Sequence, residues 1–142
     1  MDEIDFIFKL ELDEFPHQGL TKIADLIYFE GPLLSLFIAT LACRDYNGPK
    51  YLYYWCDASD VVNRWLLFSI SDKRFDLYLR KKISLREVIL EPDDGLLHVC
   101  DIDGELRYRN VYVVSPDCLP ESYIPDEDSY YEFAPEFMLG ER

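Results

Sequence analysis

The chain has 142 residues, of which 49% are hydrophobic and 15% aromatic, and its formal net charge is −14 at pH 7. This length is that of one domain with a single sizeable core, and the composition is far from that of a disordered protein. The excess of carboxylates argues against binding to nucleic acids or to anionic membranes, because both depend on Lys and Arg.

The N-terminal third predicts strands. Residues 4–12 alternate between apolar and mostly polar positions, with the period of two that is typical of a half-buried strand. Residues 13–21 contain Pro16 and Gly19 and predict a loop. A second strand is expected over residues 23–30, and it ends at the turn signal Gly31-Pro32.

The next strands are more apolar. Residues 33–43 predict a central strand that is covered on both faces, and residues 51–57 predict an aromatic-rich strand. Asn47-Gly48 between them favours a hairpin whose loop is slightly longer than the tightest type, since both residues tolerate positive φ. After the polar residues 58–63, another strand is expected over residues 64–70.

Two short helices follow. Ser71 can cap a helix, and Ser84 can cap a second one with Glu87 in the capping-box position. Residues 92–95, with Pro92 and Gly95, end the second helix. The positions that repeat with helical spacing are Phe75, Tyr78, Leu79 and Lys82 in the first helix, and Leu85, Val88 and Ile89 in the second.

Two last strands are predicted over residues 96–102 and 105–114, around the hairpin signal Asp103-Gly104. The expected fold class is therefore α+β: a mainly antiparallel sheet of about six to seven strands, with two short helices inserted between strands. We expect a single domain over residues 1–114 and an acidic, aromatic-containing C-terminal extension over residues 115–142.

The negative charge lies at the two ends. Residues 1–15 hold six acids and one base, residues 115–142 hold eight acids and one base, and the other 99 residues hold 14 acids and 12 bases. A purely solvating tail has little use for large apolar side chains. The extension nevertheless contains Tyr123, Ile124, Tyr130, Tyr131, Phe133, Phe137 and Met138. We therefore expect residues 121–139 to be ordered against the protein's own body or against a partner.

Catalytic candidates are few. His98 and Cys100 are two apart in a strand and share a face, so they suit a nucleophile with its base or a pair of metal ligands; a buried hydrogen-bonded pair is the alternative. Residues 101–105 resemble the start of a calcium loop but lack its later ligands, which favours a hairpin tip. We therefore expect that the protein is not an enzyme and that it binds neither a metal nor a cofactor.

The aromatic residues from Tyr51 to Trp55, with Trp65 and Phe68, fit a base-stacking platform or a sheet core, and the scarcity of nearby basic residues favours the core. The basic residues gather in the predicted helices. This basic patch could be a solvated face or could receive the acidic extension or an acidic partner. It consists of Lys73, Arg74, Arg80, Lys81, Lys82 and Arg86.

The four cysteines, Cys43, Cys56, Cys100 and Cys118, form no CxxC motif, which favours free thiols in a reducing compartment. The sequence shows neither a secretory signal nor an apolar stretch that is long enough to span a membrane. We expect a cytoplasmic protein.

Several short motifs lie along the middle of the chain. They are residues 27–34 (IYFEGPLL), Tyr51-Leu52 with Trp55, residues 64–66 (RWL) to 69–71 (SIS), residues 83–86 (ISLR) and residues 91–95 (EPDDG). With these motifs the chain resembles, over about residues 22–95, a family of small bacterial proteins known only as a domain of unknown function. The resemblance implies one compact α+β domain and a bacterial or phage origin, and thus the cytoplasm of a bacterium or of a phage's host, without an activity or transferable site residues.

Three functions stay open. The first is a non-enzymatic interaction module, of the antitoxin, immunity or defence-accessory type, which binds a protein with a basic surface. The second is a phage-type inhibitor that mimics DNA with its carboxylates, and the third is an enzyme that uses His98 and nearby carboxylates. Homo-oligomers fit any of them. For the interaction module, the predicted partner-binding residues are Tyr123, Asp126, Glu127, Asp128, Tyr130, Tyr131, Glu132 and Phe133.

Overall fold

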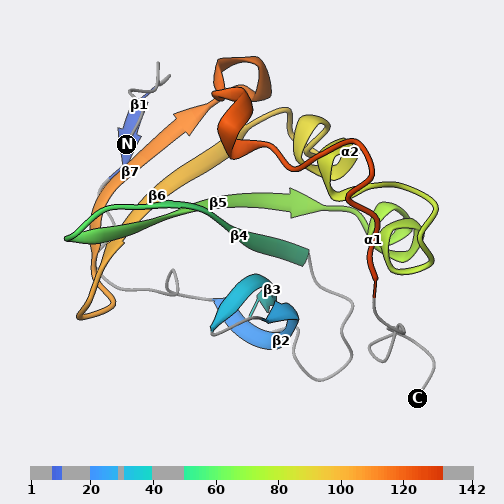
Figure 1. Cartoon of the computed structure of the whole chain (residues 1–142), viewed down its shortest axis with the longest axis horizontal. Coiled ribbons are helices and arrows are strands. Elements are labelled where there is room, and N and C mark those ends of the chain that lie inside the picture. Colours follow the sequence, from blue (N-terminus) through green and yellow to red (C-terminus); the bar gives the residue numbers. More distant parts are fainter. Residues whose placement is uncertain (1–7, 11–19, 29–30, 40–49, 133–142) are drawn as a thin grey trace.

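The fold is a single antiparallel sheet with two short helices between its strands (Figure 1). The computed structural model describes residues 8–10, 20–28, 31–39 and 50–132. The elements are β1 (Phe8–Leu10), β2 (Leu20–Tyr28), β3 (Pro32–Ala39), β4 (Lys50–Ala58), β5 (Val62–Ile70), α1 (Asp72–Leu79), α2 (Leu85–Leu90), β6 (Leu97–Asp103), β7 (Tyr108–Val114) and two 3-10 turns, Pro116–Cys118 and Glu121–Tyr123.

The sheet contains all seven strands in the order β1-β7-β6-β5-β4-β3-β2, and each neighbouring pair is antiparallel. Strands β2 to β7 follow one another across the sheet, whereas β1 lies at the far edge beside β7. Helices α1 and α2 connect β5 to β6. The prediction of a mainly antiparallel sheet with two inserted short helices is confirmed.

Several predicted boundaries were wrong by a few residues. Strand β2 begins at Leu20, inside the predicted loop, because its pairing with β3 extends to Leu20 opposite Ala39. Strand β5 begins at Val62 rather than at Arg64, since Val62 pairs with Asp103 of β6. Residues 4–7, 11–19, 29–30 and 40–49 lie outside the described residues, and so does the predicted Asn47-Gly48 turn.

The β6–β7 hairpin turns differently from the prediction. Instead of a two-residue Asp-Gly turn, the Leu106 amide donates to the Asp103 carbonyl (3.0 Å) and the Asp103 amide donates to the Arg107 carbonyl (3.0 Å). The left-handed residue is Leu106 (φ 62°), not Gly104. One Asp103 carboxylate oxygen accepts the amides of Glu105 (2.9 Å) and Arg107 (3.1 Å), which stabilises this longer turn.

Both predicted serine N-caps form. The Ser71 hydroxyl accepts the Arg74 amide (3.3 Å), and the Ser84 hydroxyl accepts the Glu87 amide (3.1 Å). Helix α1 ends at Leu79, so Lys82 lies outside it. The predicted apolar positions are all buried: Phe75, Tyr78 and Leu79 in α1, and Leu85, Val88 and Ile89 in α2.

The sheet is buried on both faces. On one face, β-strand side chains such as Leu66 and Phe68 pack with α1, with α2 and with Leu119, Tyr123 and Tyr131. The other face has its own cluster. It contains Phe37, Tyr53, Leu67, Cys100, Ile102, Tyr108 and Val111. Strand β3 contributes Leu34 and Leu36 to the first cluster and Phe37 to the second, which confirms that it is covered on both faces.

Residues 115–132, which we call the C-terminal segment, lie on the helix-bearing face. In Figure 1 the orange-to-red chain leaves β7 and runs past α2 and then past α1. Its apolar side chains Leu119, Tyr123 and Tyr131 belong to the main core. The segment therefore packs on the protein's own body, one of the two outcomes that its apolar content predicted. Residues 133–139 of the predicted ordered stretch lie outside the described residues.

Candidate interaction surface

Four polar side chains form a row across β4, β5, β6 and β7. Asp57 pairs in register with Arg64, Arg64 with Asp101, and Asp101 with Asn110. We call these four residues the polar row. Arg64 and Asp101 are only 7% and 1% exposed. A buried charge of this kind is costly unless it is paired and hydrogen-bonded.

The two buried charges of the row, Arg64 and Asp101, are paired with each other. Arg64 binds Asp101 at two points, Nε to Oδ1 (2.7 Å) and Nη2 to Oδ2 (2.9 Å), and the Asn110 amide donates to the same Oδ2 (3.2 Å). Two-point binding suits the planar guanidinium fork. Burial would lower the pKa of Arg64, but the hydrogen bonds and the charge of Asp101 raise it overall. The guanidinium is therefore held charged.

Tyr123 connects the C-terminal segment to this row. Its hydroxyl accepts a hydrogen bond from Arg64 Nη1 (3.0 Å) and donates one to Asp57 Oδ2 (2.9 Å). The guanidinium carbon lies 5.9 Å from the centre of the Tyr123 ring. Burial raises the pKa of Tyr123, the Arg64 hydrogen bond lowers it, and Asp57 raises it, so the net pKa is raised and the phenol keeps its proton.

A second anchor joins the segment to the start of α2. The Leu85 amide donates to the Ser129 carbonyl (2.8 Å), and the Arg86 amide donates to the Ser129 hydroxyl (3.1 Å). The Arg86 guanidinium donates to the Pro125 carbonyl (3.1 Å) and pairs with Glu121 (2.7 Å). The hydrogen bond between their side chains raises the pKa of Arg86 and lowers that of Glu121.

A third anchor is aromatic. The Tyr131 ring packs against Tyr78 of α1, with ring centroids 5.4 Å apart, and both side chains are buried. Burial raises the pKa of Tyr78, and the neighbouring Tyr131 adds to this effect. An aromatic pair of this kind contributes beyond the area it buries.

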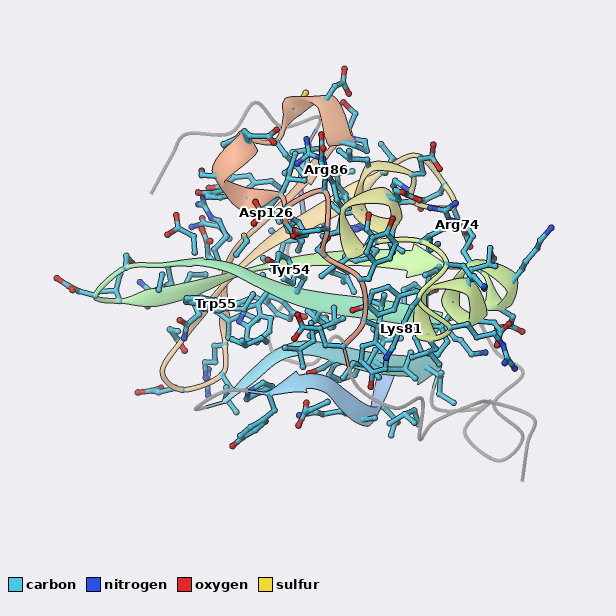
Figure 2. All side chains as sticks on the ribbon, turned by 45° about the vertical axis from the view of Figure 1, so that its right-hand side comes forward. Tyr54, Trp55, Arg74, Lys81, Arg86 and Asp126 are labelled. Atoms are coloured by element: carbon cyan, nitrogen blue, oxygen red, sulfur yellow. The ribbon has the colours of Figure 1, made fainter. Side chains whose placement is uncertain are left out.

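The outward side of the segment is acidic. Between Pro125 and Ser129, two contact points of the second anchor, the chain turns: the Ser129 amide donates to the Asp126 carbonyl (3.2 Å) and the Tyr130 amide donates to the Asp128 carbonyl (2.8 Å). We call residues 126–128 the acidic turn. Asp126, Glu127 and Asp128 are exposed, and the Tyr130 side chain beside them is 42% exposed. In Figure 2, Asp126 lies close to Arg86.

The predicted partner-binding residues therefore separate into two groups. Tyr123 and Tyr131 are 3% and 5% exposed, so the prediction that they face a partner was wrong: they anchor the segment in the protein's own core. The exposed group consists of Asp126, Glu127, Asp128, Tyr130 and Glu132. Phe133 lies outside the described residues.

The basic patch also divides. Arg86 binds the C-terminal segment, Arg74 donates to the Glu87 carbonyl (3.0 Å) and pairs with Glu91 (3.3 Å), and Arg80 pairs with Asp76 (3.1 Å). Lys73, Lys81 and Lys82 are exposed, and no carboxylate of the described residues lies within 4.0 Å of their amines. Figure 2 shows Arg74 and Lys81 to the right of Asp126 and Arg86.

Their surroundings make His98 and Cys100 less suited to catalysis or metal binding than their spacing in the sequence suggested. Cys100 is fully buried, and this burial raises the pKa of its thiol, which disfavours the thiolate that a nucleophile or a metal ligand requires. His98 is half-buried. Among the described residues, no group of three or more His, Cys, Asp or Glu side chains could hold a metal ion.

The aromatic residues behave mainly as core. Tyr53 is buried, and its hydroxyl lies 2.6 Å from that of Tyr108. Trp55 and Trp65 pair across β4 and β5, and the Trp55 indole donates to Asn63 (3.0 Å).

The polar row was not predicted from the sequence. A usable signal was present, however, because Arg64 and Asp101 are charged residues next to strand stretches that are otherwise apolar.

The chain matches a family model described as a family of unknown function (DUF6575) over residues 28–130. It belongs to this family. The match confirms the resemblance to a family of unknown function, but it begins at residue 28 rather than at about residue 22 and extends well beyond residue 95, so the DUF6575 region includes the polar row, Tyr123 and the acidic turn. No curated protein and no solved structure matches the chain. In the described part of the chain, no helix is long and apolar enough to cross a membrane.

Proposed function

We propose that this DUF6575 protein is a non-enzymatic interaction module that binds a protein with a basic surface. The binding site is the outward side of the C-terminal segment, made of Asp126, Glu127, Asp128, Tyr130 and Glu132. Antitoxins, immunity proteins and accessory subunits of bacterial or phage defence systems are the forms in which we expect such a module, acting in the cytoplasm.

One observation carries this proposal: the segment buries its anchoring side chains and turns its carboxylates outward. Tyr123, Ser129 and Tyr131 fix it at three places, so the acidic turn is held in one position. A partner then meets a preorganised site and loses little conformational entropy on binding. The exposed Tyr130 ring between carboxylates offers apolar contact area, as aromatic side chains do in many protein interfaces.

The experiment compares two variants that each lose three negative charges. The first is Asp126→Asn/Glu127→Gln/Asp128→Asn, and the second is the control Asp60→Asn/Asp93→Asn/Glu105→Gln, in which all three substituted residues are exposed elsewhere. Tagged wild-type chain captures partners from its native host, and the affinity of the recovered protein for each variant is then measured at two salt concentrations.

We expect the first variant to weaken binding by at least about tenfold and to reduce its salt dependence, while the control stays near wild type. Equal affinity for all three proteins would contradict the proposal, and so would equal weakening by both variants. In the second case, net charge rather than the acidic turn would govern the association.

A further inference from the structure

The Arg64–Asp101–Asn110 part of the polar row forms its hydrogen bonds without the C-terminal segment. Asp101 receives two hydrogen bonds from Arg64 and one from Asn110, all from within the sheet. The Tyr123 hydroxyl adds only the bonds to Arg64 Nη1 and to Asp57. If Tyr123 leaves, water can replace these two bonds, and the Arg64–Asp101 pair is not broken.

The segment also adds no strand to the sheet. The strands β2 to β7 hydrogen-bond to one another through their own ladders. The segment is attached instead through side chains and through the α2 amides of Leu85 and Arg86. Segments attached in this way can open with a smaller free energy than the whole domain needs to unfold.

From these two features we infer that the C-terminal segment is a strap that opens separately from the sheet, and that the Tyr123 hydroxyl is the positioning group that keeps it closed. The strap carries the acidic turn, so the turn is held in its binding position only when the strap is closed. This last step rests on the proposed function, whereas the opening of the strap does not.

The closure has a quantitative consequence for binding. For a partner that needs the closed strap, the apparent association constant is the intrinsic constant multiplied by the fraction of molecules whose strap is closed. A substitution that opens the strap therefore weakens binding without changing any residue that touches the partner.

The test uses Tyr123→Phe, which keeps the buried ring and removes its hydroxyl. The matched control is Tyr53→Phe, which removes a buried hydroxyl that lies 2.6 Å from Tyr108 Oη on the opposite face of the sheet. The readout is native-state hydrogen exchange of the full chain, without any partner. The amides of Leu85 and Arg86 report on the strap, because they donate to Ser129. The amides of β5 and β6 report on the sheet.

For Tyr123→Phe we expect the exchange of Leu85 and Arg86 to accelerate by about 10- to 100-fold relative to wild type, since a hydrogen bond to a charged group is lost. The sheet amides should change much less. For Tyr53→Phe we expect no selective acceleration of Leu85 and Arg86. Equal acceleration of strap and sheet in Tyr123→Phe would overturn the inference, and so would unchanged exchange at Leu85 and Arg86.

The same variants separate the two proposals. If Tyr123→Phe opens the strap and also weakens the captured partner, while Tyr53→Phe does neither, both proposals are supported. If Tyr123→Phe opens the strap and the partner binds as before, the closed fraction is still near one and the inference about the strap stands alone. The variant Asp126→Asn/Glu127→Gln/Asp128→Asn then decides whether the acidic turn is the binding site.

Discussion

Lys81 adopts a backbone conformation that costs most residues free energy. It lies just after α1 with φ of 64°. Its amide donates to the Tyr78 carbonyl (3.0 Å), and the next amide, that of Lys82, donates to the Leu77 carbonyl (2.8 Å). These two bonds are the pattern of a Schellman motif, in which the left-handed position is usually glycine. The chain has a lysine there, so this helix end is strained.

Replacing that lysine should stabilise the protein. In Lys81→Gly, the cost of a side chain in the left-handed region disappears, and we expect the free energy of unfolding to rise by about 1 kcal/mol. Urea denaturation measures the change. The control is Lys82→Gly, at a neighbouring residue without positive φ, where greater freedom of the unfolded chain should lower stability by about 0.5 kcal/mol. A loss of stability in both variants would show that Lys81 is not strained.

At the scale of elements, the C-terminal segment contains two adjacent tyrosines with opposite surroundings. Tyr131 packs on Tyr78 and belongs to the main core, whereas Tyr130 is 42% exposed. They differ by one position in the chain and share the same chemistry. Substituting each tyrosine in turn therefore measures how much burial adds to the free energy of unfolding, because the two residues are of the same type.

We expect Tyr131→Ala to lower the free energy of unfolding by about 3–4 kcal/mol, because it removes a large buried ring and leaves a cavity. Tyr130→Ala should change it by less than about 1 kcal/mol, as is usual for partly exposed positions. Thermal or urea unfolding of the two variants, compared with wild type, gives both numbers. Similar losses for the two would mean that the segment does not dock as described.

The elements that were predictable from the sequence depend on neighbours in the chain. Ser71 and Ser84 cap helices through amides three residues away, and the hydrophobic periods of the strands and helices are likewise local. The anchors were not predictable, because they join distant positions. Arg64 and Asp101 are 37 residues apart, and Arg64 and Tyr123 are 59 apart. The apolar content of the extension indicated docking, but nothing local indicated which tyrosine would be buried.

For the whole molecule, buried acids with raised pKa values set an upper pH limit to stability. Burial raises the pKa of the Cys56 thiol from 9.0 to about 12, with Arg64 opposing the shift. It also raises the pKa values of Cys100, Tyr54 and Tyr78. These groups are neutral in the folded state at a pH where the unfolded chain has already lost their protons.

The stability should therefore be complete below about pH 9 and decline above it. Between pH 9 and 12, Cys56 alone contributes a slope of about 1.4 kcal/mol per pH unit, since the unfolded thiol is ionised there and the folded one is not. Urea denaturation between pH 7 and 11 measures the decline. In Cys56→Ala the slope should be shallower. The same slope in both proteins would show that groups other than Cys56 cause the loss of stability at high pH.

The position of β1 affects how the chain can assemble during synthesis. Strands β2 to β5 pair with sequence neighbours, so they can form hairpin by hairpin while the ribosome is still adding residues. Strand β1 pairs only with β7 among the described strands, with Phe8 opposite Val113, so it must wait for more than a hundred residues. Long-range closure of this kind is slow. Among the described strands, β1 is thus made before the others but is the last to find its partner, and this edge of the sheet is the one most exposed to misassembly while β7 is still missing.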